Sequence, residues 1–212
     1  MPMSQSPLRL YVDSLFTSPY AMSVFVTLRE KGLDFDLVTL DLDAAQNQTA
    51  DFARLSVTQR VPTLVEGDFA LSESSAITEY LEDAYPDTAV YPADFKQRAR
   101  ARQVQAWLRS DLLPIRQERS TLVVFCGQQM PPLSPVAEAA ASRLITGAQA
   151  LLAGNPTHLF GEWSIADVDL AIMLNRLILN GDSVPAELVA YAQRQWQRPS
   201  VQEWVNQPRP AL

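Results

Sequence analysis

The stretch QRVPTLVEGDFALSESSAI (59–77) decides the fold of the first part of the chain. Two short apolar runs, Thr63–Val65 and Phe69–Leu71, flank Glu66-Gly67-Asp68, a pattern typical of a β-hairpin. A glutamate among three serines then marks the start of a helix. The apolar residues of this helix recur at helical spacing, and it stops before Pro86.

Upstream of the hairpin, short strands and helices alternate. Leu8, Leu10 and Val12 alternate as a strand does, and a second strand is expected over residues 37–42. Between them, Ser18-Pro19 opens a helix that Gly32 closes. A further short helix is expected within 49–55. The order βαβαββα with a mixed sheet is the thioredoxin-like arrangement, and we assign it to residues 1–85.

In the rest of the chain, the apolar residues recur at the spacing of helices and not of strands. Residues 86–93 have the composition of a linker, and residues 94–212 are helical in pattern throughout. Residues 94–120 predict one long helix bent at Pro114, Ser134-Pro135 predicts a helix start, and Ser164–Asp167 a capping-type start. The predicted fold class is therefore α/β plus all-α, a small thioredoxin-like domain followed by a larger helical one.

Composition excludes several functions. The 24 acidic and 17 basic residues leave a net charge of -7, which argues against a nucleic-acid binder. No apolar run is long enough to span a bilayer, and the N-terminal residues lack the pattern of a signal peptide. One cysteine and one histidine make a zinc site improbable, and the lone Cys126 fits a cytoplasmic setting.

Four stretches, in this order, resemble the glutathione transferases over nearly the whole length of the chain. They are TSPYAMSVFVTLREKGLDFD (17–36), QRVPTLVEGDFALSESSAITEYLED (59–83), YP (91–92) and FGEWSIADVDLAI (160–172). The resemblance is to serine-type, bacterial, cytosolic members. It implies that the first domain binds glutathione and that the helical domain lines the site of an electrophile.

For the first domain, the resemblance implies a cis Val61-Pro62 bond whose Val61 backbone pairs with the cysteinyl unit of glutathione. Without the resemblance, the simpler interpretation is that Pro62 only marks the start of a strand. Arg60, with Gln59 as a helper, is expected at the glycine carboxylate, and a solvated arginine is the alternative.

Glu73 and Ser74 are expected to bind the γ-glutamyl end of glutathione. A helix N-terminus attracts a carboxylate, the Ser74 hydroxyl adds a hydrogen bond, and Glu73 can pair with the ammonium group. The competing interpretation is ordinary capping, with Ser72 at the N-cap.

Ser18 is the residue expected to interact with the sulfur of glutathione. Ser18-Pro19-Tyr20-Ala21 stands where glutaredoxin-like relatives carry Cys-Pro-Tyr-Cys, so dithiol exchange within this motif is impossible. A hydroxyl at a helix N-terminus can instead donate a hydrogen bond to the glutathione thiolate. Thr17 is the alternative donor. Many serine-type members carry an arginine soon after this turn, where the chain has Met22-Ser23, so the subgroup stays open.

In the helical domain, Arg98, Arg102 and Arg109 share one face of the first helix. We read this stripe as a solvated face, with a cleft lining that favours anionic ligands as the alternative. His158 is taken as structural or solvated, and Trp163 and Trp196 as packing residues.

The expected function is a glutathione transferase that stabilises the thiolate of its co-substrate for attack on a small hydrophobic electrophile or hydroperoxide. No metal and no further cofactor are expected, and the family usually forms homodimers. A glutathione-dependent disulfide reductase and a non-catalytic interaction protein are the alternatives.

Overall fold

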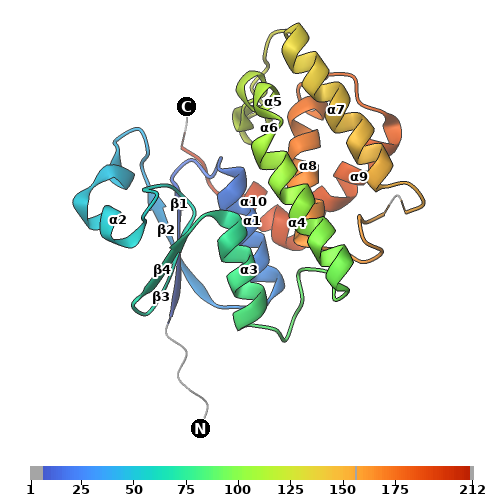
Figure 1. The fold of residues 1–212 in the computed structure, drawn as a ribbon. Coiled ribbons are helices and arrows are strands. Elements are labelled where there is room, and N and C mark those ends of the chain that lie inside the picture. The colour runs from blue at the N-terminus through green and yellow to red at the C-terminus, as the bar shows by residue number, and fades with distance from the viewer. Residues whose placement is uncertain (1–6, 156, 211–212) are drawn as a thin grey trace. The chain divides into compact units, whose positions relative to one another are not determined.

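The computed structural model describes residues 7–155 and 157–210, which excludes the N-terminal residues where the signal pattern was sought. This part of the chain divides into two compact units. The first contains the described residues up to Ala89 together with those from Asn206 onward, and the second runs from Val90 to Val205. Figure 1 labels their helices and strands.

The first unit is built on a four-stranded sheet of order β2-β1-β3-β4, in which β1 runs parallel to β2 and antiparallel to β3. Its elements are β1 (Leu8–Asp13), α1 (Pro19–Glu30), β2 (Phe35–Leu40), the 3-10 turn η1 (Gln46–Gln48), α2 (Ala50–Leu55), β3 (Thr63–Glu66), β4 (Phe69–Ser72) and α3 (Ser74–Ala84). This is the thioredoxin-like βαβαββα order that the sequence predicts.

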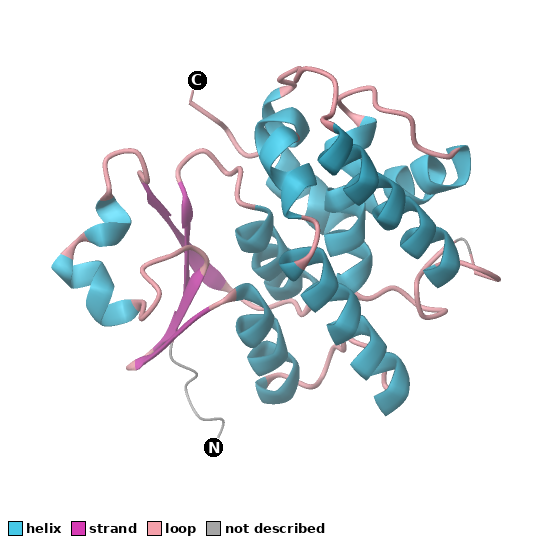
Figure 2. Ribbon diagram, turned by 45° about the horizontal axis from the view of Figure 1, so that its top comes forward, coloured by secondary structure: helices cyan, strands magenta, loops and turns pink. Residues whose placement is uncertain are grey.

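The two faces of the sheet are covered by different helices. In Figures 1 and 2, α1 and α3 lie on one face and α2 on the other. Side chains alternate along β1, so Leu8, Leu10 and Val12 are buried. Tyr11 instead meets Phe52 of α2, with ring centroids 5.6 Å apart.

Strand β2 begins and ends two residues earlier than the sequence predicts. Phe35 pairs with Leu8 in the parallel ladder, and its ring packs edge-on against Phe25 at 5.6 Å. After Leu40 the chain turns, because Asp41 exchanges hydrogen bonds with Gln46. Contacts with distant residues therefore set the start of this strand, and a local turn sets its end.

The second unit is helical. Its elements are α4 (Phe95–Ser110), α5 (Leu113–Glu118), α6 (Thr121–Cys126), α7 (Pro135–Leu151), α8 (Ile165–Ile178), α9 (Ala186–Trp196) and α10 (Pro199–Val205). Helix α8 is the core of this unit, since all of its residues except Asp169 and Ile178 are buried. In the described residues, no helix is long and apolar enough to cross a membrane.

Two helix starts in this unit agree with the sequence prediction. Ser134 caps α7 by accepting a hydrogen bond from Ala137 N at 3.3 Å. Ser164 and Asp167 form a capping box at the start of α8. The carboxylate of Asp167 also accepts hydrogen bonds from Leu159 N and from the Tyr191 hydroxyl, both at 2.8 Å.

The predicted single helix over 94–120 is wrong, because the chain leaves the helix after Ser110 and starts α5 at Leu113. In a continuous helix, Pro114 would have no N–H to donate to the carbonyl of Ser110, and its ring would clash with that same carbonyl. Asp111 and Leu112 therefore form a break in place of a bend.

Candidate glutathione site

The strand register brings the predicted site residues of the first unit to one end of the sheet. Tyr11 pairs with Thr63, and Thr63 pairs with Ser72. Because β3 is antiparallel to both neighbours, the chain leaving β1, the chain entering β3 and the chain leaving β4 meet at the same end. These segments carry Ser18, Val61 and Glu73-Ser74 respectively. The N-termini of α1 and α3 lie at this end too.

Ser18 is the N-cap of α1, with extended backbone angles and Pro19 directly after it. Its Oγ accepts a hydrogen bond from Ala21 N at 3.2 Å. Among the described residues, this is the one hydrogen bond of the Ser18 hydroxyl, so its proton remains available for a further acceptor. The side chain is half-buried.

Asp13 holds the turn that carries Ser18. Its buried carboxylate accepts hydrogen bonds from Thr17 N at 2.7 Å, Thr17 Oγ1 at 2.9 Å and Ser18 N at 3.1 Å. No motif in the sequence predicts this role for Asp13. A carboxylate at the last position of a strand, five residues before a helix cap, is the signal that points to it.

The same contacts distinguish the two candidate hydroxyls. Thr17 Oγ1 donates its proton to Asp13, whereas Ser18 Oγ acts as an acceptor within the fold. A hydroxyl has one proton to donate. In this conformation Ser18 is therefore the better placed of the two to donate to a ligand sulfur.

Val61 stands where the chain enters β3. The Val61–Pro62 peptide bond is cis, as the resemblance implies. Within the described residues, no hydrogen bond engages the N–H or the C=O of Val61. The turn before it is fixed by the Thr63 hydroxyl, which lies 2.9 Å from both Ser56 Oγ and Arg60 O.

Glu73 occupies the N-cap position of α3 without capping it. Its side chain is exposed and makes no capping hydrogen bond. Its backbone has φ 74° and ψ 112°, a conformation that costs a non-glycine residue on the order of 1–3 kcal/mol. The capping interpretation with Ser72 at the N-cap is wrong, since Ser72 is the last residue of β4.

Ser74 is the first residue of α3 and is buried. A groove of about 610 Å³, lined by residues of α2, β4 and the start of α3, reaches the neighbouring Glu73. The start of α3 is thus open to a ligand at Glu73.

Gln59 and Arg60 have exposed side chains in the loop before β3. Gln59 has a positive φ of 53°, and its carbonyl accepts a hydrogen bond from Asn47 Nδ2 at 2.8 Å. The backbone of both residues is therefore held, by Asn47 and by the Thr63 hydroxyl, while their side chains face solvent.

In the second unit, the arginine stripe of α4 is less solvated than expected. All three side chains are half-buried. Arg109 forms an ion pair with Asp169 of α8 at 3.4 Å, and Arg98 Nε donates to Pro92 O at 3.0 Å. At least two of the three arginines therefore have structural contacts within this unit.

Two protein-family models match the chain. The N-terminal domain of glutathione S-transferase matches residues 6–83, and its C-terminal domain matches residues 94–208. Among curated relatives, glutathione S-transferase theta-3 of Mus musculus is 37% identical over 59% of this chain and 53% of its own length. Glutathione S-transferase T3 of Arabidopsis thaliana is 30% identical over 96% of this chain, but over 35% of its own length. The chain thus spans about half the length, or less, of these two relatives.

Solved structures give matches over more of both chains. A glutathione transferase homologue from Burkholderia, crystallised with bound glutathione, is 46% identical with a TM-score of 0.80. That match covers 95% of this chain and 97% of the homologue. A diazinon-metabolizing glutathione S-transferase of Bombyx mori shares the fold, with a TM-score of 0.79 at 23% identity over 94% and 95% of the two chains. On the two domain models and this similarity, the chain belongs to the glutathione S-transferase family.

Proposed function

We propose that this protein is a glutathione transferase that binds glutathione at the end of the sheet defined above and stabilises its thiolate through the Ser18 hydroxyl. The second substrate is a small hydrophobic electrophile or hydroperoxide. The observation that carries the proposal is the Ser18 hydroxyl, which caps α1 as an acceptor and keeps its proton for a ligand.

The electrostatics of this position favour an anion. The N-terminus of α1 has partial positive charge, and a hydroxyl that donates to a thiolate adds a charge-assisted hydrogen bond. A free thiol has a pKa of about 8.5, so little of it is ionised at neutral pH. Ser18 and the helix together are expected to lower that pKa by roughly one to two units.

Each of the remaining site residues is expected to bind a different part of glutathione. The N–H and C=O of Val61 are expected to pair with the cysteinyl unit as an added strand does. Ser74, the α3 N-terminus and Glu73 are expected to hold the carboxylate and the ammonium of the γ-glutamyl end. Arg60, aided by Gln59, is expected to pair with the glycine carboxylate.

The chemical step needs no protein nucleophile. The thiol proton passes to solvent, the sulfur bonds to the electrophilic carbon, and the leaving group departs with its electron pair. With a hydroperoxide, the thiolate attacks the terminal oxygen, the O–O bond breaks, and the alkoxide leaves and takes a proton from solvent to become an alcohol. The thiol of a second glutathione then attacks the resulting sulfenic acid, which gives the disulfide and releases water. Ser18 keeps its proton in both reactions. A homodimer in the cytoplasm is part of this proposal, and sedimentation of the 23.6 kDa chain tests the dimer.

The test compares Ser18→Ala with Thr17→Ala by thiolate absorbance of the glutathione complex against pH. Ser18→Ala should raise the pKa of the bound thiol while barely changing affinity. Turnover at neutral pH should fall about tenfold, because less of the bound thiol is ionised, and recover in part as pH rises. Thr17→Ala should leave the titration nearly unchanged. If Thr17→Ala shifts the titration and Ser18→Ala does not, the two roles are exchanged, and no shift in either variant overturns the proposal.

A further inference from the structure

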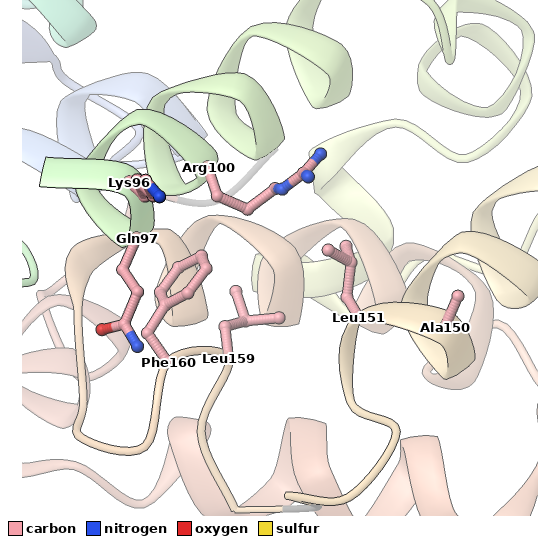
Figure 3. A pocket seen from close by; sticks show the side chains of 7 residues that line it. All are labelled: Lys96, Gln97, Arg100, Ala150, Leu151, Leu159 and Phe160. Carbon is pink, nitrogen blue, oxygen red and sulfur yellow. The ribbon is translucent and has the colours of Figure 1, made fainter. Parts of the chain in front are cut away.

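One pocket of the helical unit offers a ligand no convergent set of polar groups. It has a volume of about 490 Å³ and lies between α4, the end of α7 and the segment before α8. Figure 3 shows that the polar ends of Gln97 and Arg100 point away from each other there. Convergent polar contacts occur instead in the first unit, where the end of the described chain meets the turn before Ser18.

The residues after α10 belong to the first unit and not to the helical unit that precedes them. The first unit includes the chain from Asn206 onward, and the described part of this tail ends at Pro210. The tail, at the red end of the ribbon in Figure 1, lies beside the segment between β1 and α1. Here Arg209 Nη2 donates a hydrogen bond to Phe16 O at 3.1 Å, although the two residues are 193 positions apart in sequence.

The guanidinium of Arg209 is held at two of its nitrogens. Nη2 donates to Phe16 O, and Nη1 donates to Gln207 O at 3.1 Å. The side chain is half-buried. Because a guanidinium presents its donors in a rigid planar fork, bonds from two of its nitrogens fix the orientation of the whole group. The contact with Phe16 therefore has a defined geometry.

The peptide between Phe16 and Thr17 is held at both ends. Its C=O accepts the hydrogen bond from Arg209, and its N–H, on Thr17, donates to Asp13 Oδ2 at 2.7 Å. Phe16 is buried and has φ 51°, which a non-glycine residue adopts only where its surroundings impose it. Since a peptide unit is planar, holding its two ends fixes its orientation and the direction in which the chain enters Ser18.

The other backbone contacts of this turn engage N–H groups. Ser14 N donates to Leu40 O at 2.9 Å, which ties the start of the turn to β2. The Asp13 carboxylate accepts hydrogen bonds from the two N–H groups that follow Phe16. Arg209, in contrast, engages a carbonyl. Loss of Arg209 would thus remove a restraint on the Phe16 carbonyl that the N–H contacts do not supply.

We propose that Arg209 is a positioning residue for thiolate formation, which holds the Phe16–Thr17 peptide so that the Ser18 hydroxyl points at the sulfur of bound glutathione. This inference rests on the proposed function, because Arg209 acts only through Ser18. A hydrogen bond weakens steeply as its angle departs from linear, so a Ser18 hydroxyl on a loosened turn stabilises the thiolate less. The tail of the chain thereby takes part in ionising the co-substrate.

Titration of the thiolate absorbance of the glutathione complex against pH tests this role. Arg209→Ala should raise the pKa of the bound thiol by about half a unit to one unit, because the hydroxyl remains but is less well directed. Turnover at neutral pH should fall about two- to fivefold and recover as pH rises. The KM for glutathione should stay near that of the parent, because the residues proposed to bind the rest of the tripeptide lie on other segments.

Arg143→Ala is the matched control. It removes an exposed arginine of the helical unit, whose ion pair is with Asp111 at 3.4 Å, and should titrate as the parent does. An equal shift in this control overturns the proposal, since net charge alone would then explain the effect.

The double variant Ser18→Ala/Arg209→Ala separates an effect through Ser18 from an independent one. If Arg209 acts through the Ser18 hydroxyl, the double variant should have the same thiol pKa as Ser18→Ala. A further rise, of the size seen in Arg209→Ala alone, overturns the proposal, because the guanidinium would then act on the thiolate by its charge.

The same titrations distinguish failure of this inference from failure of the proposed function. If Ser18→Ala raises the thiol pKa and Arg209→Ala does not, Ser18 keeps its role and the positioning role of Arg209 is wrong. A lower unfolding temperature of Arg209→Ala would then show a contact that serves stability alone. If Ser18→Ala leaves the titration unchanged, the proposed function fails and this inference fails with it.

Discussion

At the scale of single residues, the proposed glutathione site includes two side chains, Ser18 and Glu73, that the fold leaves able to bond to a ligand. The Ser18 hydroxyl accepts a hydrogen bond from Ala21 N, so its own proton stays available to a ligand. The Asp13 carboxylate holds the turn before Ser18. Glu73 stands in a strained backbone conformation with an exposed side chain. A strained residue that makes no capping bond is a candidate for function, because glycine would adopt the same backbone conformation at lower energy.

Replacing Glu73 by glycine should therefore separate stability from binding. Glu73→Gly should raise the free energy of unfolding by about 0.5–1 kcal/mol, because glycine has no Cβ and adopts a positive φ without steric strain. Glutathione binding should weaken by about 2 kcal/mol or more through loss of the carboxylate. Urea denaturation and calorimetry measure the two effects.

Glu73→Gln is the matched control, since it keeps the backbone strain and removes only the charge. It should lose binding without the gain in stability. Unchanged glutathione affinity in both variants would remove Glu73 from the site.

At the scale of elements, the helical unit contains a contact between α4 and α7 that only a glycine permits. A Cβ atom on Gly147 would lie 2.7 Å from Cη2 of Trp107. The Trp107 ring is itself held by a hydrogen bond from Nε1 to Asp111 Oδ2 at 3.2 Å. This close approach explains why a glycine stands inside α7, where alanine would be the better helix former.

Gly147→Ala should consequently destabilise the protein by about 1–2 kcal/mol, the usual effect of overpacking. In a typical helix the same change stabilises by about 0.5–1 kcal/mol. Thermal or urea unfolding measures the difference. In a Trp107→Leu background the substitution should become neutral or stabilising, and a loss of the same size in both backgrounds would exclude the Trp107 contact as its cause.

At the scale of the whole molecule, the Asp167 cluster couples global stability to pH. Burial raises the pKa of the Asp167 carboxyl above its ordinary value, although hydrogen bonds from Leu159, Ser164 and Tyr191 oppose the shift. Between the ordinary and the raised pKa, the folded chain holds a proton that the unfolded chain has lost. The contribution of Asp167 to stability is therefore greatest below this window and declines as pH rises through it.

Asp167→Asn provides the comparison. It should cost about 1–3 kcal/mol at neutral pH, because an amide NH₂ then faces a buried N–H donor. The difference in unfolding free energy between parent and variant should grow as pH falls through the window and stay flat at pH values above it. Urea denaturation over this pH range measures that difference, and a difference that shrinks towards acid would contradict the raised pKa.

Much of the fold followed from local patterns alone. The alternation of Leu8, Leu10 and Val12, the hairpin around Gly67 and the caps at Ser18, Ser134 and Ser164 each depend on residues close in sequence. They are short-range features, and the structure contains all of them. The set of residues proposed to bind glutathione also came from the sequence, through its resemblance to a family.

Other features required the tertiary structure, because they depend on partners far away in the chain. Strand β2 starts where Phe35 meets Leu8 and Phe25. Ser18, Val61 and Glu73 are far apart in sequence and meet only through the antiparallel register of β3. The sequence by itself thus determined which local elements form. Only long-range packing decided where β2 begins and how residues 18, 61 and 73 come together, because those outcomes depend on contacts made after the elements assemble.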